Sequence, residues 1–189
     1  MKKLFSLLIV VGLLITVNQS LAAQEKSVAR KLFYGELFGP GVVMSINYDS
    51  RINSNARLGL GYRIGVGYGF EKFDDKFVEI LFKNGIVNDF HKGVMGTFYS
   101  FPVGLNYVIG KPKNASAFEV GAGVTFLTQK VSMYNWEMEK PGNVIGSLNF
   151  MYRLMPVNGG VSIRIGFTPI IGTAGDLFPM GAVSFGYAF

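Results

Sequence analysis

Residues 58–70 read LGLGYRIGVGYGF, and an apolar side chain occupies every second position. Because successive side chains of a β-strand point to opposite faces, this alternation predicts a strand. One face is leucine, tyrosine, isoleucine, valine and phenylalanine, and the other is glycine and arginine. A glycine-rich phosphate loop would instead follow a short strand and open a helix. No helical period follows these residues, so we interpret them as a strand and not as a nucleotide-binding loop.

The same alternation recurs along the chain, with one apolar face and one face of glycine, polar or charged residues. Its further segments are 42–51, whose apolar face starts at Val42, and 98–109, 117–128, 144–154, 161–168 and 182–189. Long strands with apolar outsides, polar insides and aromatic ends are typical of a transmembrane barrel, whose closure leaves no unpaired backbone edge in hydrocarbon. A soluble barrel of the lipocalin kind would place the apolar face inward, and the period alone does not separate the two.

The connections between these segments indicate how many strands there are. Bacterial barrels have an even strand number, short periplasmic turns and longer outer loops. Counting back from Phe189, the inner turns are PVN, GKPKNA and INSN, and the outer connections are GTAGDLF, 132–142 and 73–96. Parity then requires residues 31–38 as a first strand, with FGPG as a tight outer turn. If they only continued the next strand, a further strand at 77–87 would be needed. We therefore predict an all-β fold, a transmembrane antiparallel up-and-down β-barrel of eight strands.

The start of the chain predicts export. Two lysines precede an apolar run at 4–17, and small residues follow it, ending with Ala22 and Ala23. This is the pattern of a secretory signal peptide, and the run is too short for a membrane-spanning helix, which needs roughly 20 apolar residues. We expect cleavage after Ala22 or Ala23, which makes 1–22 the signal peptide and 23–189 the outer-membrane barrel domain.

Composition narrows the partners of the exported chain. The mean hydropathy is +0.32, and charged residues make up 16%, compared with about 25% in ordinary soluble domains. The absence of cysteine excludes disulfides, zinc–thiolate sites and a lipid-modified N-terminal cysteine. The formal charge of +6 falls to +4 once the two lysines at positions 2 and 3 leave with the signal. In an exported protein this excess favours contact with outer-membrane lipid headgroups and lipopolysaccharide, not nucleic acid.

Residues typical of catalysis or metal binding are sparse. Lipid-modifying barrels use a serine, a histidine and often an acid, but His91 is the only histidine here. Asp89 is two positions away, and the nearest serine is Ser100. Asp74 and Asp75 lack the ligand spacing of a calcium loop. We therefore predict that the protein is not an enzyme and has no catalytic residues, no cofactor and no metal site. A lipid-modifying enzyme is a less favoured alternative.

The inward faces predict a network of charges in the lumen. Aligned by height from the inner turns, Glu36, Arg63, Glu119 and Arg164 fall near the middle of the first, third, fifth and seventh strands. Their charges alternate around the ring, so we expect them to pair and to plug the barrel. Eight-stranded barrels are only wide enough for side chains to fill. Because Arg57 falls near the rim, we expect Arg63→Ala to destabilise the protein more than Arg57→Ala.

Two classes of function stay open. The first is a closed barrel with a structural or surface-interaction role through its extracellular loops, and the second is a small pore or ligand-carrying barrel with a continuous wet lumen.

The segment 71–93 is long enough to suggest a functional loop. Its NG pair at 84–85 predicts a hairpin, and the exposed edge of such a ribbon could add a partner's strand. Residues 73–96 are therefore a candidate surface for an extracellular partner, with a lid over the barrel mouth as the alternative.

The mature chain resembles the small eight-stranded outer-membrane proteins such as OmpX and the barrel domain of OmpA. The stretches YGELFGPGVVMSINYDSR, FEVGAGVTF, RIGFTPI and SFGYAF are also similar to an uncharacterised porin-like outer-membrane group of Bacteroidota. The resemblance implies the outer membrane of a Gram-negative cell, but no activity. It also implies that Phe189, with Tyr187 and Phe185, forms the C-terminal signal read by the β-barrel assembly machinery.

Overall fold

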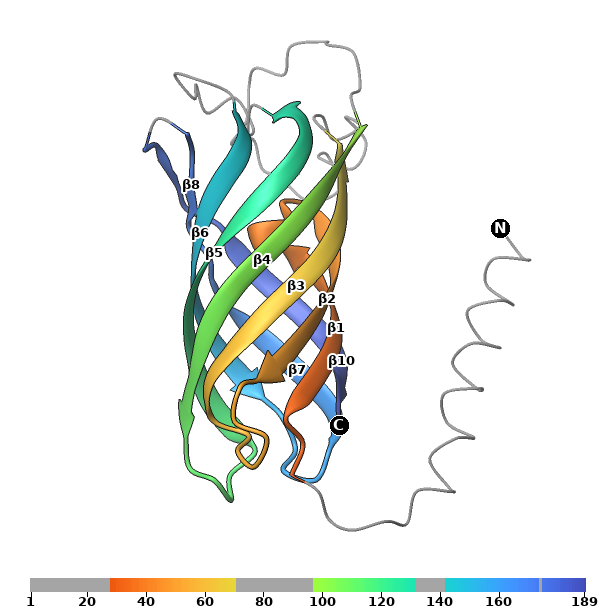
Figure 1. Cartoon of the computed structure of the whole chain (residues 1–189), viewed down its shortest axis with the longest axis vertical. Coiled ribbons are helices and arrows are strands. Elements are labelled where there is room, and N and C mark those ends of the chain that lie inside the picture. The colour runs from red at the N-terminus through yellow and green to blue at the C-terminus, as the bar shows by residue number, and fades with distance from the viewer. Residues whose placement is uncertain (1–27, 71–96, 132–141, 174) are drawn as a thin grey trace, which may run out of the picture.

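The fold is a closed antiparallel β-barrel (Figure 1). The computed structural model describes residues 28–70, 97–131, 142–173 and 175–189. The strands of the wall are β1 (Lys31–Phe38), β2 (Met44–Arg51), β3 (Gly59–Phe70), β4 (Thr97–Gly110), β5 (Ser116–Val131), β6 (Gly142–Leu154), β7 (Gly160–Phe167) and β10 (Gly181–Ala188). Each pairs with its neighbour in chain order, and β1 pairs with β10 to close the ring. The predicted all-β barrel of eight strands is confirmed within the described residues.

Residues 31–38, which parity required as a first strand, form a separate element of the wall. β1 pairs with β10 from Leu32↔Ala188 to Phe38↔Ala182 and with β2 on its other side. Backbone hydrogen bonds between Lys31 and Phe189 in both directions, each 2.9 Å long, extend this seam to the chain end. The alternative strand at 77–87 lies outside the described residues, as do the signal segment 1–22, the long connection 71–93 and His91.

Two short strands extend the wall at the end away from Phe189. β8 (Ile170–Ile171) pairs with β6 and with β9 (Leu177–Phe178). β9 lies in the predicted outer connection GTAGDLF, and β8 directly precedes it. Pro169 and Pro179 separate this hairpin from β7 and β10, because proline cannot donate to a strand ladder. A hydrogen bond from Thr168 N to Met180 O, 2.6 Å long, joins the chain after β7 to the chain before β10, next to the two prolines.

The two faces of the wall have the polarity that the alternation predicts. Apolar side chains point outward along every wall strand, and Ile64, Leu105 and Phe185 are 50%, 56% and 63% exposed. Arginines, carboxylates and amides point inward and are buried. This orientation is opposite to that of a soluble barrel of the lipocalin kind. No helix in the described part of the chain is long and apolar enough to cross a membrane.

The connection from β1 to β2 differs from the prediction, because it folds into the barrel instead of forming a rim turn. Gly39–Gly41 make a short 3-10 helix, η2, which is buried and visible inside the wall in Figure 1. Val42, expected on the outward face, is 2% exposed inside. Its φ of 75° and ψ of −66°, with Val43 N donating to Gly41 O, form a γ-turn that turns the chain inward. We call residues 39–43 the inserted turn.

Candidate functional site

Seven charged side chains meet inside the barrel and form the candidate site. They come from six strands, and no side chain among them is more than 2% exposed. Arginine alternates with carboxylate from one end of the row to the other. We call this row the charge chain, and its members in order of contact are Arg63, Glu36, Arg164, Glu119, Arg153, Asp49 and Arg51.

Arg164 on β7 joins two carboxylates at the centre of the charge chain. Its Nη2 lies 2.7 Å from Glu119 Oε1, and its Nη1 lies 3.4 Å from Glu36 Oε2. The register explains the second contact, because Glu36 on β1 and Arg164 on β7 both stand opposite Ser184 on the strand between them. Ser184 Oγ donates to Glu36 Oε2 at 3.0 Å. The guanidinium carbon of Arg164 lies 4.4 Å from the centre of the Tyr34 ring, a cation–π contact.

The other half of the charge chain centres on Arg153 of β6. Its Nε lies 3.1 Å from Glu119 Oε2, and its Nη2 lies 3.0 Å from Asp49 Oδ1. Arg51 Nη2 then contacts both oxygens of Asp49 at 2.7 Å. Asn106 stands between the acids: its Nδ2 donates to Asp49 and, at 3.3 Å, to Glu119, and its Oδ1 accepts from Arg51 Nη2 at 2.6 Å. The carboxylates are therefore shared by donors from both sides.

The four residues singled out from the sequence all lie in this row. Arg63 Nη1 is 3.7 Å from Glu36 Oε1, and Glu36 leads through Arg164 to Glu119. The expected ring of alternating charges is an open row instead, and no ion pair within the described residues joins Arg63 to Glu119. Arg63 reaches Asn149 Oδ1 on β6 at 3.5 Å.

Sequence reasoning missed the second half of the row. The alternation already places Asp49, Asn106 and Arg153 on inward faces, and Arg51 follows Asp49 by two positions. The alternation does not show how far each side chain extends, and an arginine guanidinium lies several ångströms from its own strand. Arg153 therefore contacts acids on β2 and β5, although its backbone pairs with Ala117 and Arg164.

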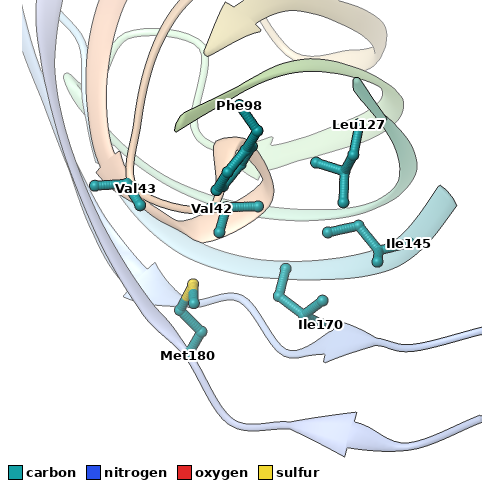
Figure 2. Packing of buried hydrophobic residues seen from close by; sticks show 7 residues of the cluster. All are labelled: Val42, Val43, Phe98, Leu127, Ile145, Ile170 and Met180. Carbon is teal, nitrogen blue, oxygen red and sulfur yellow. The ribbon is translucent and has the colours of Figure 1, made fainter. Parts of the chain in front are cut away.

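An apolar layer lies at the η2 side of the charge chain. Figure 2 shows its members around the inserted turn: Val42, Val43, Phe98, Leu127, Ile145, Ile170 and Met180. Three hydrogen bonds hold the turn. Ser100 Oγ donates to Gly41 O at 2.9 Å, Thr125 Oγ1 donates to Pro40 O at 2.7 Å, and Gly39 N donates to Met180 Sδ at 3.0 Å.

The inserted turn rests directly on the charge chain. A Cβ added to Gly39 would lie 3.4 Å from Glu36 Oε1, 3.3 Å from Thr168 Oγ1 and 2.9 Å from the Ala182 Cβ. Gly39 also has a φ of 71°, which glycine adopts without strain. A residue with a side chain at this position would push the turn away from the charges, so the site is covered closely on this side.

A second apolar cluster and Arg57 lie at the opposite end of the interior. The cluster consists of Ala29, Leu32, Tyr34, Met155 and Ala188. Arg57 donates to the carbonyl oxygens of Pro112 at 3.2 Å, of Asn114, and of Met155 at 2.6 Å. It lies toward the end of the barrel, as the sequence suggests, but it is 2% exposed and joins two turns.

Arg57→Ala should therefore lower the free energy of unfolding by about 2–3 kcal/mol, because hydrogen bonds to a charged group contribute roughly 1.5–3 kcal/mol. The measurement is a urea titration of the refolded barrel followed by circular dichroism. Arg30→Ala is the matched control, since Arg30 donates to the exposed Ser54 O at 3.1 Å and its loss should cost less than about 1 kcal/mol. Equal losses in the two variants would show that Arg57 does not join the turns in solution.

The residues of the predicted assembly signal line the outer face of the last strand. Phe185, Tyr187 and Phe189 are 63%, 37% and 51% exposed. Lys31 Nζ lies 6.0 Å from the centre of the Phe189 ring, across the seam between β1 and β10. Phe189 thus combines an exposed ring with backbone bonds that help to close the barrel.

The interior offers ion pairs and hydrogen-bond donors rather than a metal cage. Within the described ranges, no group of three or more histidine, cysteine, aspartate or glutamate side chains is placed to hold a metal ion. The three carboxylates of the charge chain each face arginines instead. The arrangement can pair each buried carboxylate with arginine and fill space.

Comparisons with known proteins yield one solved structure. The sequence matches no protein family and no curated protein. The crystal structure of the N-terminal β-barrel domain of Pseudomonas aeruginosa OprF is similar to this chain, with 11% sequence identity and a TM-score of 0.47. The similarity covers 88% of this chain and 100% of that domain.

Proposed function

We propose that this protein is an outer-membrane β-barrel with a plugged interior, which acts as a structural or surface-interaction element and not as a pore or an enzyme. The observation that carries the proposal is the buried charge chain within a wall whose outer face is apolar. A soluble protein would gain from the reverse arrangement, because apolar side chains in water forgo the hydrophobic effect.

The outer surface supports a membrane location. β3, β4, β5 and β6 have 12, 14, 16 and 13 residues, which exceeds the about 9–11 residues in which a tilted strand crosses a bilayer. The other four wall strands have 8 residues each. Aromatic pairs stand toward both ends of the wall. Tyr48 and Tyr62 lie 6.4 Å apart toward the chain-terminal end, and Tyr68 and Tyr99 lie 5.7 Å apart toward the η2 end. Aromatic side chains at two levels are typical of barrels that meet lipid headgroups on both sides.

The interior supports closure at three levels. The inserted turn and its apolar layer cover the charge chain, and the chain-terminal cluster with Arg57 closes the other end. A continuous wet lumen would need all three levels to open. We therefore favour the closed barrel over the pore or ligand carrier.

The partners we propose follow from the outer face and the chain end. Lipid and lipopolysaccharide would contact the wall, and the assembly machinery would bind Phe185, Tyr187 and Phe189 during insertion. An extracellular partner at 73–96 stays a prediction that falls outside the described residues. Phe189→Ala keeps the backbone hydrogen bonds between Lys31 and residue 189. A loss of insertion in this variant would therefore indicate a lost assembly signal and not a lost seam.

Conductance of the refolded protein in planar bilayers tests the proposal. We expect no stepwise ion current at 1 M potassium chloride, because an interior plugged at three levels would leave no path for ions. Insertion must be shown separately, by heat-modifiable migration on gels and by protease protection in liposomes. A steady current from inserted wild-type protein would support the pore instead. Protein that folds without lipid or detergent and stays soluble would contradict the membrane location.

A further inference from the structure

The charge chain contains more positive than negative charge. Four arginines alternate with three carboxylates, and the row begins and ends with an arginine. Arginine does not lose its proton in proteins, and an uncompensated charge in a buried setting is strongly unfavourable. Among the described side chains of the row, one positive charge therefore lacks a counter-charge.

The two ends of the row are not equally satisfied. Arg51 contacts both oxygens of Asp49 and also donates to Gly59 O at 2.8 Å. Arg63 has the longest ion-pair contact of the row, 3.7 Å to Glu36. Its Nη1 has no hydrogen-bond partner within the described residues, although Arg63 is 2% exposed. Arg51 Nε also lacks a hydrogen-bond partner within the described residues, but Arg51 has two carboxylate contacts at 2.7 Å, so Arg63 has the weaker ion pair of the two ends.

Other buried donors stand near this guanidinium. The Tyr34 hydroxyl, on the strand that also carries Glu36, is buried without a hydrogen-bond partner in the described part of the chain. Arg63 reaches Asn149 on β6, and Ser147 is the next inward-facing residue of that strand. Ser147 Oγ is also buried without a partner among the described groups.

We propose that the barrel holds one small monovalent anion of the size of chloride against Arg63, on the side of the guanidinium that faces β6. One negative charge balances the row, whereas a divalent anion would leave an excess of the opposite sign. The guanidinium and hydroxyl groups supply donors, as an anion requires. The anion acts as an eighth member of the charge chain. Its role is separate from the proposed function in the membrane, because it stabilises the folded barrel itself.

The test compares unfolding of the detergent-refolded protein in sodium chloride and in sodium gluconate at equal ionic strength. Gluconate is too large for a filled interior. We expect the apparent melting temperature to rise with the logarithm of the chloride concentration, by about 3 °C or more for each tenfold increase above the dissociation constant. Bromide should replace chloride, and its anomalous scattering in crystals should give a peak beside Arg63.

Three variants separate specific binding from general salt effects. Arg63→Met balances the row, so the difference between chloride and gluconate should disappear together with the bromide peak. Arg57→Met removes a buried arginine outside the row and should leave the difference unchanged. Glu36→Gln adds to the excess positive charge of the row, so the difference in melting temperature between chloride and gluconate should persist or increase. This variant allows the test to proceed if Arg63→Met does not fold. Equal stability in both salts, a chloride effect that survives in Arg63→Met, or bromide bound only elsewhere would overturn the proposal.

Discussion

Replacing Glu119 with glutamine should lower the free energy of unfolding of the barrel by about 3–5 kcal/mol, the range for breaking a buried ion pair. Glu119 contacts Arg153 at 3.1 Å and Arg164 at 2.7 Å. The glutamine keeps the shape but leaves two buried guanidinium groups short of charge. Urea titration of protein refolded in lipid vesicles measures the loss.

A double variant shows that the loss arises from charge and not from packing. Glu119→Leu combined with Arg164→Met removes one charge of each sign and leaves the balance of the row unchanged. The combined loss should be smaller than the sum of the two single losses, by an interaction energy of about 1–3 kcal/mol. If Glu119→Gln changes stability by less than about 0.5 kcal/mol, as ordinary surface substitutions do, the charge chain is hydrated and does not seal the barrel.

The second large effect concerns the inserted turn and ion flow. Phe38 N donates to Val43 O at 2.7 Å, so this pair can flank a two-residue turn. Replacing Gly39–Val42 with Asn-Gly would remove the Val42 side chain from the interior. It would also remove the carbonyl oxygens that accept hydrogen bonds from Ser100 and Thr125. We expect a loss of about 2–4 kcal/mol from burial and hydrogen bonding, with no conductance because the charge chain still spans the barrel.

Conductance should appear only when all three levels are opened. Combining the Asn-Gly replacement with Glu119→Ala, Arg164→Ala and Arg57→Ala removes the cover, the centre of the row and the arginine at the chain-terminal end, and single-channel current in planar bilayers measures the result. The charge pair removed without the turn replacement is the matched control and should stay closed. Current through the Asn-Gly variant alone would show that the inserted turn, and not the charge chain, is the seal.

The part of this fold that the sequence predicts rests on a local rule. Alternation with a period of two sets which face each side chain occupies, whatever the rest of the chain does. It placed Ile64 and Leu105 outside and Glu36 and Arg164 inside, and it required residues 31–38 as a strand by parity. The same rule put six members of the charge chain on inward faces, namely Glu36, Asp49, Arg63, Glu119, Arg153 and Arg164, so the existence of a charged interior follows from the sequence.

The contacts within that interior were decided by the tertiary structure. A guanidinium reaches across strands, so the partners of Arg153 depend on how β2, β5 and β6 curve around one another. The inward path of Val42 depends on Thr125 and Ser100, which are far away in sequence and donate to the inserted turn. Arg57 is buried for the same reason, because its acceptors belong to turns that only the closed barrel brings together. A local period carries no information about such contacts, since they form only when distant strands share one enclosed volume.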